Sequence, residues 1–203
     1  MEQNVKTRKQ QAQETKQRIF DVTLQLIRER GIENVQIDEI SRKAGVSTGL
    51  FYNYFDSKVA LITEAANMES DQYYEKVRRD YLGNLRGEKK ILEFVHRISE
   101  YHEKSMNKSE LKQIYAAFLT NADRGQSITN TNRPIYHILA EAVSEMASDG
   151  QLSVEVFPED AAQHLTLLIR GVIFEYLMAD ETFEIGKAAE YMVLSHLNGI
   201  KQK

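Results

Sequence analysis

The chain has 203 residues, of which 42% are hydrophobic and 28% are charged, with ten glycines, two prolines and no cysteine. This length and hydrophobic content suffice for one or two domains with a buried core, which excludes disorder as the main state. The lack of cysteine excludes a disulfide framework, thiolate metal sites and cysteine nucleophiles, and it suits a reducing compartment. No apolar run approaches the roughly 18 residues of a membrane span and no signal-peptide core is present, so we expect a cytoplasmic protein without membrane contact.

Charge is distributed unevenly along the chain. Residues 1–58 carry ten Lys or Arg and eight Asp or Glu, whereas the remaining residues carry 16 and 22. A basic N-terminal segment followed by an acidic remainder indicates two parts with different functions. Chance variation in surface charge is an equally good explanation of so small a difference.

Helical periodicity runs through most of the chain, and alternating strand-type runs are nearly absent, so the sequence predicts an all-α fold. The first helix is expected at about residues 15–30, where an apolar stripe ends before Gly31. Two short helices should follow, and then a long fourth helix capped by Ser57. The helices expected after the first lie at about residues 37–44, 48–55, 58–82, 88–106, 109–122, 133–148, 158–179 and 183–198.

The two short helices have the layout of a helix-turn-helix. Gly45 permits a tight reversal between them, and Ser47 can cap the second helix so that its first N–H groups point outward. If Phe51 faces inward, the helical period leaves the opposite face exposed. That face carries Gly49, Leu50, Tyr52 and Asn53. These groups suit a DNA major groove, and a helical hairpin without any nucleic-acid role is the alternative.

Residues 37–58, with the sequence IDEISRKAGVSTGLFYNYFDSK, resemble the DNA-binding signature of the TetR family of transcriptional regulators. The resemblance rests on the AGVS turn, the glycine two residues after the serine, the aromatic cluster FYNYF and the S-K step that opens the fourth helix. It implies an N-terminal three-helix bundle with the helix-turn-helix, joined by a long fourth helix to a C-terminal helical bundle, about nine helices in all. The domains implied are residues 1–58 for DNA binding and residues 59–203 for ligand binding and dimerisation.

Individual roles follow from position within this signature. The resemblance implies base contacts from the start of the second short helix and phosphate contacts from the tyrosines and the lysine that come after it. With the cap at Ser47 and with Asn53 on the exposed face of the helix, the predicted DNA-binding residues are Ser47, Thr48, Gly49, Leu50, Tyr52, Asn53, Tyr54 and Lys58. Gln36 departs from the Ser or Thr that often caps the first short helix in this family.

Enzyme and metal signatures are absent from the sequence. Its five histidines do not form HExxH or a comparable ligand spacing. The glycines of the turn lack the Gly-Lys-Ser/Thr ending of a phosphate-binding loop, and there is no GxSxG motif. We therefore expect no catalytic residues, no metal and no cofactor.

A small-molecule pocket is expected among the helices at 88–106 and 109–122, whose apolar stripes include a few polar and aromatic groups. The resemblance implies such a pocket as well. The candidate lining residues are Tyr101, His102, Tyr115 and Phe118. Their character favours a hydrophobic or amphipathic effector, and the alternative is that they are core residues at the end of the bundle.

The expected helix at 158–179 is apolar on both sides, so it has to be covered twice. It forms a pair with the last helix, and a four-helix interface between two copies of the chain would cover both. The candidate interface residues are Leu168, Gly171, Val172, Met192 and His196. A deeply buried central helix within a monomer is the alternative.

The sequence therefore predicts a homodimeric regulator that binds double-stranded DNA. Members of the resembling family are most often repressors, released from a palindromic operator by a small molecule. A second interpretation is an activator, or a regulator that does not respond to a small molecule. A protein of a different class, an all-α interaction module, would show no duplex affinity that falls with salt.

Overall fold

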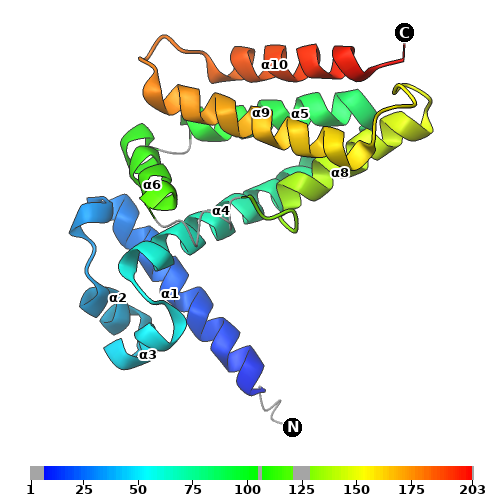
Figure 1. Ribbon diagram of the computed structural model, residues 1–203. Helices are drawn as coiled ribbons and strands as arrows, with labels where there is room; N and C mark the ends of the chain where they lie inside the picture. The colour runs from blue at the N-terminus through cyan, green and yellow to red at the C-terminus, as the bar shows by residue number, and fades with distance from the viewer. Residues whose placement is uncertain (1–6, 105–106, 121–128, 203) are drawn as a thin grey trace. The chain divides into compact units, whose positions relative to one another are not determined.

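The computed structural model describes residues 7–104, 107–120 and 129–202. Nine α-helices and one 3-10 helix occur within these ranges, which confirms the predicted all-α fold (Figure 1). Contacts divide the chain into two compact units, Met1–Glu69 with Gln113–Ile128, and Ser70–Lys112 with Thr129–Lys203. The division after residue 58, inferred from the resemblance, stays a prediction about function.

The first unit is built around the N-terminal helices. In chain order it contains α1 (Arg8–Arg30), η1 (Ile32–Asn34), α2 (Ile37–Ala44), α3 (Thr48–Tyr54), the beginning of α4 (Lys58–Tyr81) and the end of α6 (Lys108–Thr120). α2 packs against α1 and α3. The largest side chains without exposure in this unit are Ile19, Leu26, Ile40, Phe51, Phe55 and Leu61. An apolar core thus fixes α3 from behind.

The first helix begins at Arg8, so its predicted start near residue 15 is wrong. Thr7 caps the helix: its hydroxyl oxygen accepts from the Gln10 backbone N–H at 3.2 Å, and the Gln10 side-chain oxygen accepts from the Thr7 N–H at 2.8 Å. Such a capping box satisfies two N–H groups that would otherwise lack partners. The polar residues 8–14 therefore remain helical without an apolar stripe.

The other helix ends lie close to the predicted ones. α3 ends at Tyr54, and Phe55 follows it as the C-cap. The hydroxyl oxygen of Ser57 accepts from the Ala60 N–H at 3.1 Å, which confirms the predicted cap of α4. The expected ends at residues 105–106 and 121–122 lie outside the described residues.

The second unit is a helical bundle. It contains the end of α4, α5 (Gly87–Lys104), the beginning of α6, α8 (Pro134–Ser148), α9 (Pro158–Met178) and α10 (Ile185–Ile200). α5 packs against α8 and α10, and α9 packs against the same two helices (Figure 1). The ammonium of Lys90, which is 7% exposed, lies 2.8 Å from Glu141 and 2.6 Å from Glu145 and so links α5 to α8. Among the helices of the described ranges, none combines the length and hydropathy that a bilayer-spanning segment requires.

Candidate functional site

A left-handed glycine separates α2 from α3. Gly45 has φ 68° and ψ 37°, and its N–H donates to the carbonyl of Arg42 at 3.2 Å. Residues other than glycine adopt this conformation only at a cost. Immediately after the turn, the hydroxyl oxygen of Ser47 accepts from the Leu50 N–H at 3.1 Å and caps α3. The chain therefore starts a new helix at Thr48 without a longer loop.

The two faces of α3 differ sharply in exposure. Phe51 in α3 and Phe55 just after the helix are fully buried, and the centroids of their rings are 5.5 Å apart. On the opposite face Leu50 is 37% exposed and Tyr52 is 51% exposed. Gly49 has open space where a Cβ would stand. The exposed face therefore has the small, apolar and phenolic groups expected from the sequence.

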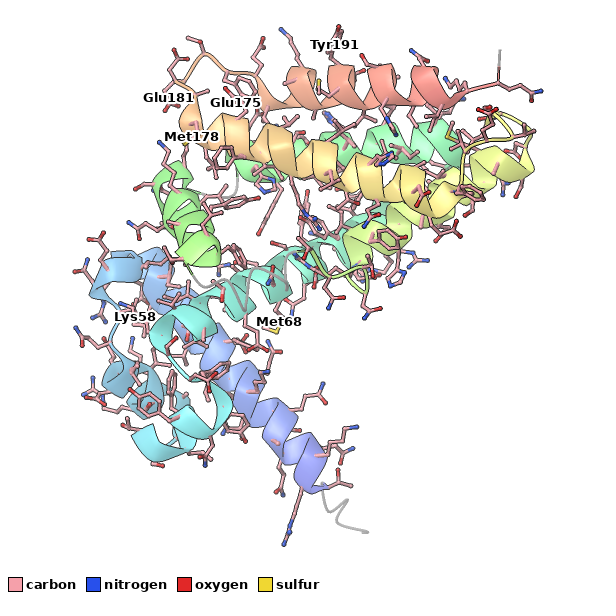
Figure 2. All side chains as sticks on the ribbon, in the orientation of Figure 1. Lys58, Met68, Glu175, Met178, Glu181 and Tyr191 are labelled. Atoms are coloured by element: carbon pink, nitrogen blue, oxygen red, sulfur yellow. The ribbon has the colours of Figure 1, made fainter. Side chains whose placement is uncertain are left out.

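Besides Ser47, two of the predicted DNA-binding side chains already hold a partner within the protein. The hydroxyl of Thr48 donates to the carboxylate of Asp38 on α2 at 3.1 Å. The ammonium of Lys58, at the start of α4 (Figure 2), donates to the backbone carbonyl of Glu33 at 3.3 Å. Burial lowers the pKa of Lys58, against the opposing effect of the Glu33 charge. Sequence reasoning missed Asp38, because no local pattern reports which side chains meet across the turn.

Ion pairs attach α2 and the beginning of α4 to α1. Arg30 holds Glu39 of α2 with two bonds of 3.0 and 2.6 Å. The hydrogen bond from Arg30 lowers the pKa of Glu39. Lys16 pairs with Glu64 of α4. Gln36 makes no side-chain cap on α2, so the acidic first turn and the Arg30 pair hold this helix start instead.

One face of α9 is left open by the second unit. Leu165, Ile169 and Ile173 are buried, whereas Leu167, Phe174 and Met178 are 56, 45 and 68% exposed. Together with Gly171, these exposed residues are 4, 3 and 4 positions apart along the helix, a spacing typical of a face that packs against another helix. On α10, Tyr191 is 71% exposed and lies on the side away from α9 (Figure 2). A deeply buried central helix is therefore not what the described residues form.

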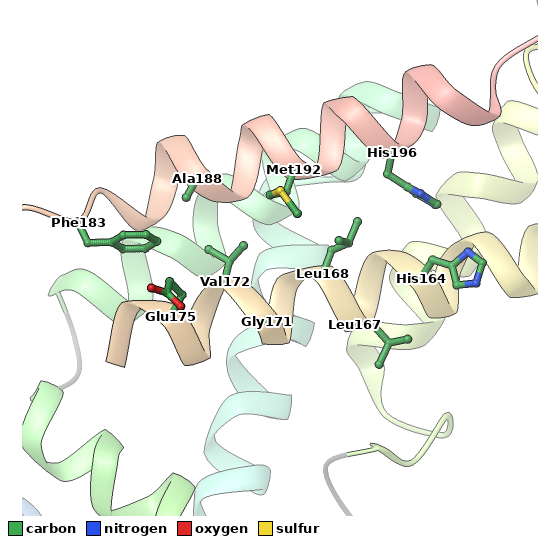
Figure 3. A pocket seen from close by; sticks show the side chains of 10 residues that line it. All are labelled: His164, Leu167, Leu168, Gly171, Val172, Glu175, Phe183, Ala188, Met192 and His196. Carbon is green, nitrogen blue, oxygen red and sulfur yellow. The ribbon is translucent and has the colours of Figure 1, made fainter. Parts of the chain in front are cut away.

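A groove of about 660 Å³ runs between α9 and α10 on this open face. Figure 3 shows Leu168, Val172 and Met192 facing one another along it. The predicted interface residues Leu168, Gly171, Val172, Met192 and His196 all line the groove. Its lining is otherwise His164, Leu167, Glu175, Phe183 and Ala188. The groove is an apolar strip on a helix pair and not an enclosed chamber.

Two histidines close one end of this groove (Figure 3). The rings of His164 and His196 pack edge to face with centroids 5.5 Å apart. Nε2 of His196 is buried and has no hydrogen-bond partner within the described chain. Burial, and to a smaller extent His164, lowers the pKa of His196.

The four predicted effector-binding residues fall into two pairs in different units. Tyr101 and His102 belong to the second unit, and Tyr115 and Phe118 belong to the first. Each pair is therefore described within its own unit. Tyr101 is 8% exposed and stacks on Tyr73 with centroids 4.1 Å apart.

His102 and Phe118 are buried as well, and Tyr115 is half-buried. Nδ1 of His102 lies 2.8 Å from the Ile98 carbonyl, so this nitrogen donates. Burial lowers the pKa of His102 more than this hydrogen bond raises it. Phe118 is 7% exposed and packs edge to face with Tyr115 at 6.2 Å.

A smaller cavity of about 190 Å³ lies beside Tyr101. It is lined in part by Tyr73, Tyr81, Arg97 and Lys104, so it is more polar than the pocket expected from the sequence. Across the described ranges no three His, Cys, Asp or Glu side chains are grouped so that they could hold a metal ion.

Comparison with known proteins points to one family. A family model described as bacterial regulatory proteins, tetR family, matches residues 19–65, which include the helix-turn-helix. The chain is 26% identical over 189 residues to the HTH-type transcriptional regulator AcrR of Shigella flexneri, which covers 89% of this chain and 86% of that protein. It is 20% identical over 190 residues to the fatty acid metabolism regulator protein of Bacillus subtilis (strain 168), and the alignment covers 91% of this chain and 95% of that protein.

A solved structure shares the fold. FadR of Thermus thermophilus, a TetR family transcriptional repressor in complex with lauroyl-CoA, superposes with a TM-score of 0.75 at 20% identity, covering 93% of this chain and 96% of that chain. Helix order and all-α architecture therefore extend over nearly the whole molecule. Residues 19–65 thus match the model of the tetR family of bacterial regulatory proteins, and the chain is similar along most of its length to transcriptional regulators and, in fold, to a TetR family repressor.

Proposed function

We propose that this protein is a homodimeric repressor that binds a palindromic operator in double-stranded DNA and leaves it when a small molecule binds. The observation that carries the proposal is the α3 surface. Buried phenylalanines hold the helix from behind, and its small, amide and phenolic groups face outward from a capped N-terminus. A helix presented in this way fits the major groove, where base edges are read.

The proposed contacts divide into base reading and phosphate binding. Thr48, Leu50 and Asn53, beside the open space at Gly49, would meet base edges. Tyr52, Tyr54 and Lys58 would meet phosphate, and Ser47 would support both by capping the helix. Lys58 has to give up or share its bond to the Glu33 carbonyl to do so.

Dimerisation through α9 and α10 follows from the exposed seam. A stripe that includes Leu167, Phe174 and Met178 is costly to leave in water, and two copies related by a two-fold axis would bury it in a four-helix bundle. Leu168, Gly171, Val172, Met192 and His196 would lie at that interface. Two symmetric recognition helices then explain why the operator should be palindromic.

The effector proposed is a hydrophobic or amphipathic small molecule. Support comes from the likeness in fold to the Thermus thermophilus repressor, whose ligand, lauroyl-CoA, is amphipathic. Tyr101 and His102 in the second unit, and Tyr115 and Phe118 in the first, stay as two separate pairs of candidate effector-binding residues. We propose no enzymatic activity, because the relatives are transcriptional regulators. A protein that acts on bacterial DNA in this way would work in the cytoplasm.

Selection from a random duplex library tests the proposal. Purified protein is mixed with random duplex DNA, and bound fragments are sequenced after several rounds. The expected result is an inverted repeat whose half-sites are about one helical turn apart, bound with an affinity that falls steeply with salt. Recovery of no enriched sequence, with no salt-dependent duplex binding, would instead favour the all-α interaction module. Transcription from a promoter that carries the selected site distinguishes a repressor from an activator.

A further inference from the structure

A hydrogen bond joins α2 to α3 on the surface proposed to face DNA. The hydroxyl of Thr48, the first residue of α3, lies 3.1 Å from a carboxylate oxygen of Asp38, in the first turn of α2. Both residues are exposed. An ionised carboxylate only accepts hydrogen bonds, so the hydroxyl proton must point toward Asp38. The Thr48 oxygen then has only lone pairs left for another partner.

Asp38 differs in this respect from the acidic residue next to it. Glu39 is held by two bonds from Arg30, so its charge is neutralised within the helical bundle. Asp38 has no cation within salt-bridge distance among the described residues, and the Thr48 hydroxyl is its hydrogen-bond partner. A carboxylate without a cation on a DNA-binding face is repelled by phosphate and lowers affinity for DNA in general. Such repulsion is offset only where the carboxylate meets a hydrogen-bond donor.

The major groove offers few donors. Cytosine presents its N4 amino group and adenine its N6 amino group, whereas guanine presents two acceptors, O6 and N7, and thymine one, O4. Adenine also has an N7 acceptor beside its amino group. In a base pair, cytosine keeps one free N4–H that a carboxylate oxygen can accept, and it has no acceptor beside it that would repel a second oxygen. A pair of oxygens that can only accept therefore matches cytosine best and guanine worst.

We propose that Asp38 and Thr48 act together as an acceptor pair that selects cytosine and rejects guanine at one position of each operator half-site. Asp38 accepts from the base and at the same time fixes the Thr48 hydroxyl so that its oxygen faces the groove as an acceptor. This inference rests on the proposed function, because it requires that α3 enters the major groove.

Selection from the random duplex library with paired variants tests the assignment. Asp38→Asn replaces one acceptor oxygen by a donor amide, and Thr48→Val removes the hydroxyl at nearly constant shape. Thr48→Ser keeps the hydroxyl, and Asp21→Asn on α1 makes the same charge change away from this pair. We expect the unaltered protein, Thr48→Ser and Asp21→Asn to select cytosine at the same half-site position.

At that position we expect Asp38→Asn and Thr48→Val to lose about 5- to 150-fold of the discrimination between cytosine and guanine, the range for one good base contact. Asp38→Asn should accept purines there, because an amide can donate to the N7 of either purine and to the O6 of guanine. It should also bind random duplex DNA more tightly than the unaltered protein, since a charge repelled by phosphate is gone. Thermal unfolding of each variant checks that the fold is intact.

Two results would overturn the inference while leaving the proposed function standing. One is that Asp38→Asn and Thr48→Val enrich the same base at every position as the unaltered protein. The other is a shift in Asp38→Asn with none in Thr48→Val, which would show that the two side chains do not act as a pair. If the unaltered protein enriches no sequence and binds no duplex, the proposed function itself fails.

Discussion

At the residue scale, a small number of side chains determine how α3 is presented. Gly45 reverses the chain in a left-handed conformation, Ser47 caps the new helix, and Phe51 anchors it in the core. Each acts through a local or short-range contact whose cost or benefit is about 1 kcal/mol or more. The DNA-facing residues contribute little to the fold, so their substitution tests function with limited effect on stability.

Replacing Lys58 should weaken DNA binding without changing sequence preference. Lys58→Ala removes a phosphate contact, so affinity should fall for all duplexes alike, and the slope of log affinity against log salt should decrease by about one. Tyr52→Phe should also lower affinity uniformly, because Tyr52 is half exposed and its hydroxyl would donate to phosphate. Titration of labelled duplex at several salt concentrations measures both. Lys89→Ala, an exposed lysine on α5, is the control; an unchanged slope in Lys58→Ala would remove the phosphate assignment.

The buried His102 should make stability depend on pH. Burial lowers its pKa in the folded protein below the ordinary value of 6.5. The unfolded chain therefore binds a proton that the folded chain does not, and the stability present above about pH 6.5 is lost as pH falls toward the lower folded pKa. The slope from one such group is at most about 1.4 kcal/mol per pH unit.

Urea unfolding at about pH 7.5 and about pH 5.5 measures this dependence. His102→Asn keeps a donor near the Ile98 carbonyl but cannot be protonated, so its stability should fall less on acidification than that of the unaltered protein. His196 has a pKa lowered in the same direction, so some pH dependence should persist in the variant. Identical pH dependence in both proteins would show that His102 does not titrate in this range.

At the scale of elements, α9 shows what periodicity does and does not determine. Its apolar residues occupy both sides of the helix, and the second unit covers only one of them. The open side carries regularly spaced exposed apolar residues on either side of Gly171. Gly171 also lines the groove between α9 and α10. An apolar helix face of this kind is stable in water only when another surface covers it.

Substitution of Gly171 separates association from folding. No atom lies within 4 Å of a Cβ placed at this glycine, so a larger side chain fits within the second unit. Leucine also favours a helix by roughly 0.8 kcal/mol relative to glycine, so Gly171→Leu should not destabilise the isolated chain. Across a packed dimer interface, the same side chain should cost about 1–3 kcal/mol of association.

Sedimentation at micromolar concentration distinguishes these effects. The unaltered protein should be a dimer, and the Gly171→Leu dimer should have a larger dissociation constant than the Ala147→Leu dimer. Ala147→Leu is the control, because it adds an equally large side chain at an exposed position of α8. A monomer for the unaltered protein would contradict the proposed dimer. Equal dissociation constants for the two variants would place Gly171 outside the interface.

For the whole molecule, α4 is one of two described helices, with α6, that belong in part to each compact unit. Its residues up to Glu69 belong to the first unit, and those from Ser70 belong to the second. A helix common to the two units provides a continuous connection through which an event in one can change the other. The proposed repressor needs such a connection, because a ligand shifts an equilibrium only if it binds one state better than another.

Effector and operator should therefore oppose each other's binding. Calorimetry of an effector, with lauroyl-CoA as the first probe, is carried out with and without the selected operator present. A coupling of about 1–3 kcal/mol predicts a 5- to 150-fold weaker effector affinity in the presence of DNA, and by linkage an equal loss of operator affinity. Equal affinities in both titrations would exclude this allosteric mechanism and leave DNA binding unaffected.

Local signals in the sequence determined much of this protein. Within the described ranges, the order of the helices, the turn at Gly45 and the caps at Ser47 and Ser57 were all predicted, because each depends on residues near one another in the sequence. The same kind of signal was overlooked at Thr7. There a capping box extends α1 through polar residues, where apolar periodicity carries no information.

The tertiary structure decided what depends on contacts between distant residues. It showed that Asp38 meets Thr48 across the turn, and that one side of α9 stays open. It also assigned Tyr101 and Tyr115 to different compact units. Hydrophobic pattern reports that a side chain prefers to be buried, but it does not report which surface buries it. That choice depends on how helices far apart in the sequence pack, and so only the folded chain contains it.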